Sequence, residues 1–141
     1  MLQGFFMALV GGSAYFTTIY SHEDDDLFIF EFLGIALFLF GMIFETLADW
    51  QLTQHLKNPE NKGKIIKSGL WRYSRHPNYF GEVVLWWGIF VFACSIEWGW
   101  TTLWSALTIN LLIRFVSGVP FIEKKYAERP DFIEYKRETN C

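Results

Sequence analysis

The stretch LFIFEFLGIALFLFGMIFETLADW, residues 27–50, decides the fold class of this chain. It is almost entirely apolar, and its charged residues are confined to Glu31, Glu45 and Asp49. A helix needs roughly 20 mostly apolar residues to cross the hydrocarbon core of a bilayer. The sequence therefore predicts a transmembrane helix over about residues 27–50.

Three further stretches meet the same requirement, at about residues 2–20, 79–96 and 98–122. Hydrophobic residues make up 52% of the 141-residue chain and aromatic residues 20%, and a soluble domain of this length would struggle to bury so many large rings. We therefore predict an all-α fold, a polytopic integral membrane helical bundle of about four transmembrane helices. At this length it forms a single membrane domain over residues 1–141.

Eleven of the twelve Lys and Arg residues fall into two short segments. Six lie within residues 57–75 and five within residues 124–137, whereas Arg114 stands inside an apolar run. Cytoplasmic loops of membrane proteins carry an excess of Lys and Arg, so both basic segments are predicted to be cytoplasmic. With four spans, both termini and the loop 51–78 share that side, and the acidic turn 21–26 lies on the other.

Prolines predict where elements begin and end. Pro77 is expected to begin or break the third helix, Pro120 to kink or end the fourth, and Pro130 to open a short helix through Arg137. Cys94 lies in an apolar run and Cys141 ends the chain, so neither suggests a disulfide framework or a metal site. The basic residues lack the clustered, aromatic-interleaved pattern of a nucleic-acid surface, and the membrane is the expected environment.

Two carboxylates, Glu45 and Asp49, are spaced i, i+4 near the end of the second span, so they share one face of a helix. Carboxylates at membrane depth are costly and usually face a polar cavity or a partner. One interpretation places both in the wet interface, paired with the basic loop. The other makes them contacts to a ligand or cofactor.

The densest group of reactive residues is GLWRYSRHPNYFGE, residues 69–82. Its Arg72 and Arg75 suit phosphate or carboxylate groups, and a helix beginning near Pro77 would direct free N–H groups at an anion. The remaining side chains with polar chemistry are His76, Asn78, Tyr79 and Glu82, and Asn78 and Glu82 share a helix face. An ordinary basic loop bound to lipid headgroups is the alternative. We predict a cytoplasmic cofactor-binding loop here.

Arg114 lies inside the fourth predicted span, where a guanidinium must pair, reach toward water or bind a ligand. Pairing with Glu45, Asp49 or Glu82 and binding of a ligand remain equally open. Glu123 lies near the end of the same span and could close over whatever the first basic loop holds.

These residues carry a family resemblance. Residues 68–82, with Asp49-Trp50-Gln51-Leu52 upstream and Val116-Ser117-Gly118 and Glu123-Lys124-Lys125 downstream, resemble the steroid 5-alpha-reductase C-terminal-domain family, in particular its bacterial membrane proteins of unknown function. The tail RPDFIEYKRETN, residues 129–140, is similar as well. The resemblance implies a helical membrane protein that binds NADPH from the cytoplasmic side and reduces a carbon–carbon double bond in a sterol-like or other lipid.

The resemblance also implies roles for individual residues. Asp49, Asn78 and Glu82 match positions that hold the dinucleotide, and Lys57 lies near a basic position that serves the phosphates. With Arg72, Arg75, His76, Tyr79, Arg114 and Glu123 they form the predicted cofactor site, whereas the resemblance assigns no catalytic residue. The chain departs from the reductases at Glu45, Gly118 and Ile122, which stand where those enzymes have an amide, a His and a Tyr. It resembles the C-terminal part of larger members, so a missing N-terminal half or a homo-oligomer is an expected partner.

A second family shares part of the motif. The pattern Arg75-His76-Pro77-x-Tyr79-x-Gly81, followed by an acidic residue such as Glu123, also resembles isoprenylcysteine and phospholipid methyltransferases, which bind S-adenosylmethionine. Asn78 and Glu82 favour the reductase branch. The alternatives are therefore a methyltransferase acting on a lipid or prenylated substrate, and a non-catalytic membrane module.

Overall fold

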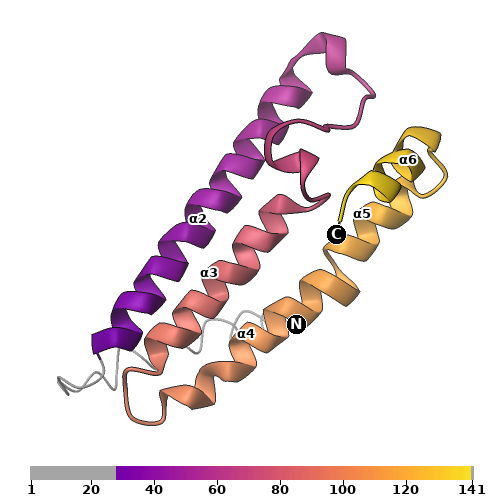
Figure 1. The fold of residues 1–141 in the computed structure, drawn as a ribbon. Helices are drawn as coiled ribbons and strands as arrows, with labels where there is room; N and C mark the ends of the chain where they lie inside the picture. The colour runs from indigo at the N-terminus through magenta and orange to yellow at the C-terminus, as the bar shows by residue number, and fades with distance from the viewer. Residues whose placement is uncertain (1–27, 141) are drawn as a thin grey trace.

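A computed structural model describes residues 28–140 of the chain, and within that range it contains helices and loops but no strand. The elements are α2 (Phe28–Lys57), the 3-10 turns η2 (Pro59–Asn61) and η3 (Gly69–Arg72), α3 (Pro77–Ala93), the 3-10 turn η4 (Gly99–Thr102), α4 (Leu103–Leu111), the π-helical turn η5 (Leu112–Val116), α5 (Val119–Tyr126) and α6 (Pro130–Glu138). The helices α2, α3 and the α4–α5 arm lie side by side (Figure 1). The all-α prediction is confirmed for these residues.

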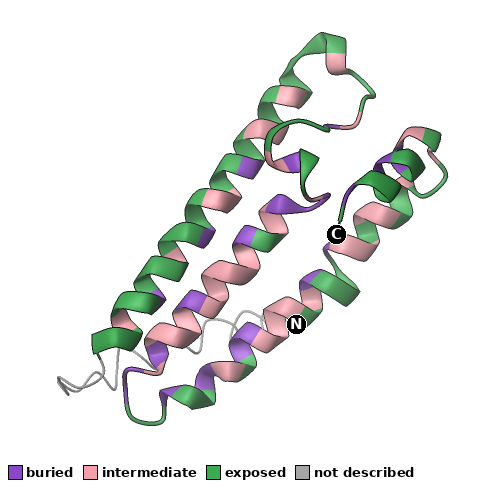
Figure 2. Cartoon of the chain, viewed as in Figure 1, coloured by how far each residue is buried: buried purple, intermediate pink, exposed green. Residues whose placement is uncertain are grey.

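Two segments are long and apolar enough to cross a membrane, Phe28–Lys57 and Gly99–Tyr126. Most of the surface of α2 is exposed, and its few buried residues form separate spots along the helix (Figure 2). The third predicted span is present as α3, which has 17 residues and is about 25 Å long, shorter than the roughly 30 Å hydrocarbon core. The first predicted span, at about residues 2–20, lies outside the described residues. Two of the four predicted spans are thus long and apolar enough in the structure to be candidate membrane-crossing helices.

Helix α2 extends beyond Trp50 as far as Lys57, so the predicted loop 51–78 begins later than expected. The predicted span ended at Trp50 because residues 51–57 are mostly polar. The helix continues through them because they contain no Gly or Pro to end it. The helix stops where Asn58 and Pro59 follow, and the Asn58 side chain accepts a hydrogen bond from the backbone N–H of Glu60 at 3.0 Å. Apolar length therefore marked the end of the span and not the end of the helix.

Four glycines allow α2 and α3 to pack with their backbones almost in contact. An added Cβ at Gly41 would lie 2.5 Å from the backbone nitrogen of Leu85, and one at Gly81 would lie 2.6 Å from the backbone nitrogen of Glu45. Gly34 and Gly88 make equally close approaches to the partner helix. Small residues at such spacing are how membrane helices approach closely. This glycine seam, defined by Gly34, Gly41, Gly81 and Gly88, fixes the start of α3 beside the second half of α2.

The second long segment is interrupted between α4 and α5. At η5 the backbone N–H of Ser117 donates to the carbonyl oxygen of Leu112 at 2.8 Å, a π-type bond across five residues. Pro120 has no N–H to donate, so the ordinary helical pattern cannot pass through it. Gly118 packs so closely that an added Cβ would lie 2.6 Å from the carbonyl oxygen of Ile113. The irregularity predicted from Pro120 is present, and it begins about two turns earlier, at Leu112.

The two basic segments meet at one end of the helical layer (Figure 1). Tyr135 of α6 is buried, and its hydroxyl donates to the carbonyl oxygens of Trp71 and Ser74. The Trp71 indole N–H in turn donates to the carbonyl oxygen of Ala48 at 3.0 Å. The backbone N–H of Arg75 donates to the carbonyl oxygen of Asn140 at 3.0 Å. Helix α6, predicted from Pro130, therefore closes over the loop that precedes α3.

Candidate functional site

The motif 69–82 folds as a short turn followed by the start of α3. Gly69 has a φ of +61°, in the left-handed region that favours glycine. The backbone N–H of the next residue, Leu70, donates a hydrogen bond to the side-chain oxygen of Gln51 at 2.9 Å. The turn η3 ends at Arg72, and α3 begins at Pro77 as predicted. The motif thus turns from the end of α2 into α3, and its polar residues are held between α2, α5 and α6.

A cavity of about 520 Å³ opens beside the first turns of α3. We call it the motif cavity, and its walls come from α2, the motif, α3 and the α4–η5–α5 arm. Its polar or ionisable side chains are Tyr73, Ser74, His76, Tyr79, Asn110, Arg114 and Asn140, and its apolar ones are Phe44, Leu70, Phe80, Val83, Ile113 and Val119. A largely apolar pocket with a few convergent polar groups is the usual form of a small-molecule site.

The predicted residues divide into two groups around α3. His76, Tyr79 and Arg114 line the motif cavity. The carboxylates of Glu82, Glu45 and Asp49 instead act on one another electrostatically, which places them near the seam between α2 and α3. The close approach of Gly81 to the backbone of Glu45 brings these helices together at that level. The structure therefore brings Asp49 and Glu82 close enough to act on each other electrostatically.

Asn78 and Tyr79 stand in the first turn of α3, and of the two only Tyr79 lines the motif cavity. Both side chains are half-buried, as is Glu82, whereas Asp49 is exposed. Tyr79 stacks on His76 with ring centroids 5.6 Å apart and also lies within electrostatic reach of Asp49 and Glu82. Its ring therefore lies between the motif cavity and the carboxylates of Asp49 and Glu82.

Arg75 is buried and fully engaged with acceptors of the protein. Its Nη2 and Nε donate to Oε1 of Glu123 at 2.8 and 3.0 Å, and its Nη1 donates to the carbonyl oxygens of Thr139 and Lys136. The second oxygen of Glu123 accepts from Lys136 Nζ at 2.6 Å. The guanidinium thus links the start of α3 to α5 and to the end of α6.

His76 is buried directly beside this ion pair. Its Nε2 has no hydrogen-bond partner among the described residues and lies 3.7 Å from Oε1 of Glu123. Burial lowers the pKa of the imidazole below its ordinary value, and the neighbouring Arg75 acts in the same direction, whereas Glu123 partly offsets both. Burial thus favours the neutral imidazole, whose Nε2 could form a hydrogen bond with a bound molecule.

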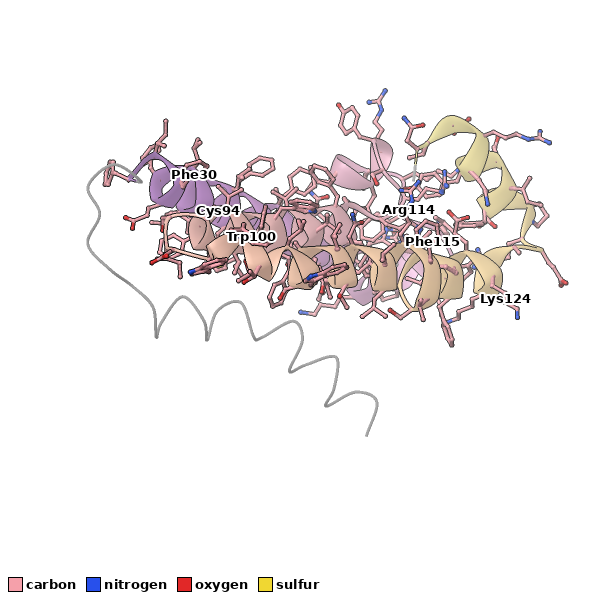
Figure 3. The ribbon with its side chains drawn as sticks, turned by 90° about the horizontal axis from the view of Figure 1, so that it is seen from below. Phe30, Cys94, Trp100, Arg114, Phe115 and Lys124 are labelled. Atoms are coloured by element: carbon pink, nitrogen blue, oxygen red, sulfur yellow. The ribbon has the colours of Figure 1, made fainter. Side chains whose placement is uncertain are left out.

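The remaining predicted cations are on the surface. Lys57 in the last turn of α2 and Arg72 at the end of η3 are exposed, and neither has an ion pair within residues 28–140. Arg114 is exposed in η5, with its guanidinium 5.9 Å from the Phe115 ring centroid. Figure 3 shows Phe30, Cys94 and Trp100 toward one end of the layer and Arg114 and Lys124 farther toward α6. The pairing of Arg114 with Glu45, Asp49 or Glu82 considered above is not found in the described part of the chain.

Several cavity residues were not predicted from the sequence. Asn110 is a single amide inside an apolar run, and a polar residue in such a position is a recognisable signal for a functional contact. Tyr73 and Ser74 lie within the motif, but their orientation toward the cavity depends on the turn η3. Asn140 carried no local signal, because it reaches the cavity only through its bridge to Ser74.

Sequence comparisons identify relatives of this chain. The chain matches the family described as "Protein of unknown function (DUF1295)" over residues 1–139. It is 39% identical over 122 residues to 3-oxo-5-alpha-steroid 4-dehydrogenase 1 of Bos taurus, covering 85% of this chain and 46% of the relative. It is 32% identical over 111 residues to steroid 5-alpha-reductase DET2 of Solanum lycopersicum, covering 77% of this chain and 41% of the relative.

A third relative, steroid 5-alpha-reductase DET2 of Gossypium hirsutum, is 35% identical over 80 residues, which cover 56% of this chain and 30% of the relative. The chain thus spans less than half the length of these curated relatives. No solved structure matches it significantly. The resemblance to steroid 5-alpha-reductases predicted from residues 68–82 is confirmed, and the two long apolar helices suit a membrane-associated protein. With a match that extends from residue 1 to residue 139, the chain belongs to the DUF1295 family.

Proposed function

We propose that this protein is a membrane oxidoreductase that uses NADPH to reduce a carbon–carbon double bond in a sterol-like or other lipid. The observation that carries the proposal is the similarity to steroid 5-alpha-reductases over 85% of the chain, which includes the motif that lines the cavity beside α3. The apolar walls of the motif cavity suit a lipid, and a bilayer around the apolar helices would keep water from the reacting atoms. Asn78 and Glu82 favour this reaction over methyl transfer.

The residues around the motif cavity fit a dinucleotide in their chemistry. Tyr73 and Tyr79 offer aromatic faces, Asn110 an amide and Arg114 a cation. The bound dihydronicotinamide would supply the hydride. Asp49, Asn78 and Glu82 would hydrogen-bond its amide or ribose, because carboxylates and amides can accept from these groups.

The cations have different roles in this proposal. Arg72 and Lys57 are exposed at the end of the layer and would neutralise phosphate groups. Arg75 would act on phosphate indirectly, since Glu123 and the tail carbonyls already occupy its guanidinium. Arg75 and Glu123 would therefore position His76 and the tail beside the nucleotide. Arg114 would face the nucleotide from η5.

The proposed placement in the membrane follows the charge pattern. α2, α3 and the α4–α5 arm would cross the bilayer together with the stretch 2–20, as one domain over residues 1–141. Both termini and the basic segment that follows α2 would face the cytoplasm, where NADPH is available. The lipid substrate would enter the motif cavity from the bilayer. A second copy of this chain is the proposed protein partner.

Ligand titration tests the proposal directly. The purified protein in detergent is titrated with NADPH and, separately, with S-adenosylmethionine, and thermal unfolding is followed. A ligand at about 100 times its dissociation constant should stabilise the protein by roughly 2.7 kcal/mol. We expect NADPH to raise the unfolding temperature and S-adenosylmethionine to leave it unchanged. Stabilisation by S-adenosylmethionine alone would assign the protein to the methyltransferases, and no response to either would contradict both activities.

A further inference from the structure

A second cavity of about 290 Å³ lies on the other side of the motif. We call it the lysine cavity. It is formed by the last turns of α2, the segment 64–66, the motif, and helices α5 and α6. Its ionisable and aromatic lining comprises His55, Lys64, Trp71, Arg75, His76, Lys125, Tyr126, Arg129, Phe132 and Tyr135. His76 is the residue that it shares with the motif cavity, and its other lining residues differ from those of that cavity.

The lining of the lysine cavity is cationic. It includes Lys64, Arg75, Lys125 and Arg129, and it includes no carboxylate. Arg75 is neutralised by Glu123, and Arg129 by Asp131 at 2.5 Å. Lys64 and Lys125 have no carboxylate within ion-pair distance among residues 28–140, and Lys125 Nζ lies 5.4 Å from the Tyr126 ring centroid. Two positive charges thus remain available to an anion.

A buried polar atom of His76 is also available to an anion. His76 is 4% exposed, and its Nε2 has no hydrogen-bond partner in the described part of the chain. Buried ring nitrogens normally have a partner, because leaving one unpaired costs about 1–3 kcal/mol. The imidazole lines the lysine cavity, and one of its nitrogens can donate to an oxygen of a bound anion.

The lysine cavity also lies at the level where headgroups are expected. It is lined by Leu52 and Leu56 from the last turns of α2 and by Ile122, Lys125 and Tyr126 from α5, so it stands at the polar ends of both candidate membrane spans. Leu56 is 70% exposed, which leaves an apolar surface beside the cationic one. Basic pockets at the ends of membrane helices are suited to anionic headgroups.

We propose that the lysine cavity binds the phosphate of an anionic phospholipid. Lys64 and Lys125 neutralise the phosphate, and Leu56 and Ile122 contact the start of the acyl chains. A phosphate could also come from a free phosphate ester or from a nucleotide. The apolar side chains at the ends of the candidate spans favour the lipid, because a soluble phosphate gains nothing from them. This inference depends on the membrane placement under the proposed function and not on the reduction itself.

A pair of double variants tests the proposal. Lys64→Gln with Lys125→Gln removes two charges from the cavity. The control variant, Lys62→Gln with Lys124→Gln, removes two exposed charges that line neither cavity. Lys62 is two residues from Lys64 and Lys124 is adjacent to Lys125, so the two variants remove the same charge from the same segments. Each protein, purified in a neutral detergent, is titrated with phosphatidylglycerol, phosphatidylcholine, inorganic phosphate and NADPH, and the shift in thermal unfolding is recorded.

We expect phosphatidylglycerol to stabilise the wild type and the Lys62/Lys124 variant, and to bind the Lys64/Lys125 variant roughly tenfold to thirtyfold more weakly. Phosphatidylcholine and inorganic phosphate should give little response, and NADPH should act equally on all three proteins. Equal weakening in both double variants would show diffuse surface charge and overturn the proposal. A loss of the NADPH response in the Lys64/Lys125 variant, with the lipid response intact, would assign the cavity to the nucleotide and overturn it as well.

Two further results complete the test. If phosphatidylglycerol does not stabilise the wild type, or if inorganic phosphate replaces it fully, the lipid is not the ligand. The NADPH titration of the wild type in the same series reports on the proposed reductase independently. Its failure would count against the reduction and would leave the lipid result standing.

Discussion

Arg75 and Glu123 join the start of α3 to α5 through a nearly buried ion pair, with Nη2 and Nε of Arg75 at 2.8 and 3.0 Å from one oxygen of Glu123. The two side chains are 7% and 16% exposed. The same carboxylate holds Lys136 of α6. A single acid therefore connects the motif, the broken segment that ends in α5, and the tail.

Removing that acid should leave a buried charge without its partner. Glu123→Gln is expected to lower the free energy of unfolding by about 3 kcal/mol, because losing one partner of a buried pair strands the other. Thermal unfolding in detergent measures the loss. Glu128→Gln, at an exposed position without an ion pair in the described residues, is the control and should change little. Equal effects of the two substitutions would mean that the ion pair does not hold the motif.

The buried imidazole of His76 predicts an acid-sensitive stability. Burial lowers its pKa in the folded protein, whereas in the unfolded chain it titrates near the ordinary value of about 6.5. The folded state therefore binds fewer protons, and its stability is complete above pH 6.5 and declines as the pH falls from there through the folded pKa. Thermal unfolding between pH 8 and pH 5 should show this decline. It should be shallower in His76→Gln and unchanged in His55→Gln, and identical profiles in all three proteins would refute the assignment.

Tyr135 predicts a change at the alkaline end. Burial raises the pKa of its phenol to about 12, from an ordinary value near 10 in the unfolded chain. The folded state keeps the proton longer, so the stability that this group contributes is present below pH 10 and is lost as the pH rises through 12. Tyr135→Phe also removes the bonds to the carbonyl oxygens of Trp71 and Ser74, and should cost about 1–3 kcal/mol at neutral pH. The variant should show a smaller alkaline loss, whereas an unchanged profile would contradict the role of the phenol.

The glycine seam predicts a steric effect. In Gly41→Val an added Cβ would collide with the backbone nitrogen of Leu85, and the backbone cannot yield as a flexible side chain can. We expect loss of the folded monomer, or destabilisation of several kcal/mol, in size-exclusion and thermal measurements. Ala36→Val, at an exposed position on the same helix, is the matched control. Tolerance of Gly41→Val at wild-type stability would show that α2 and α3 do not pack this closely.

Cofactor binding is tested at the start of α3. Asn78→Ala and Glu82→Ala should each weaken NADPH binding by about tenfold, because each removes a hydrogen-bonding group proposed to hold the nucleotide. Membrane insertion should be unchanged, since neither substitution adds bulk between α2 and α3. Thr53→Ala, exposed on α2, serves as the control. If both variants bound NADPH like the wild type, the assignment of these residues would be wrong.

The sequence predicted the helices that rest on strong local signals. Apolar length predicted α2, Pro77 predicted the start of α3, and Pro130 predicted α6. The end of α2 was placed too early, because hydropathy detects the lipid boundary while the helix continues in polar residues to Lys57. The π-helical turn at Leu112 had no local signal beyond Pro120, since it depends on how Gly118 packs against Ile113.

The sequence predicted which residues belong to the candidate site better than it predicted how they contact one another. The motif spacing identified His76, Tyr79 and Glu82, and the structure places them near one another at the start of α3. The engagement of Arg75 with Glu123 and the tail could not be read from the sequence, because it joins residues 48 and 64 positions apart. The lysine cavity was missed for the same reason, since its walls come from five segments of the chain.

The near contact of α2 and α3 along their glycines has a mechanical consequence. Helices whose backbones meet without intervening side chains cannot slide or tilt apart without losing that whole contact, so the pair behaves as one rigid body. The α4–α5 arm is different, because its hydrogen bonds are already rearranged at Leu112–Val116 and broken before Val119. Any opening that admits a large molecule beside α3 should therefore occur by swinging of this arm, with residues 117–118 as the hinge.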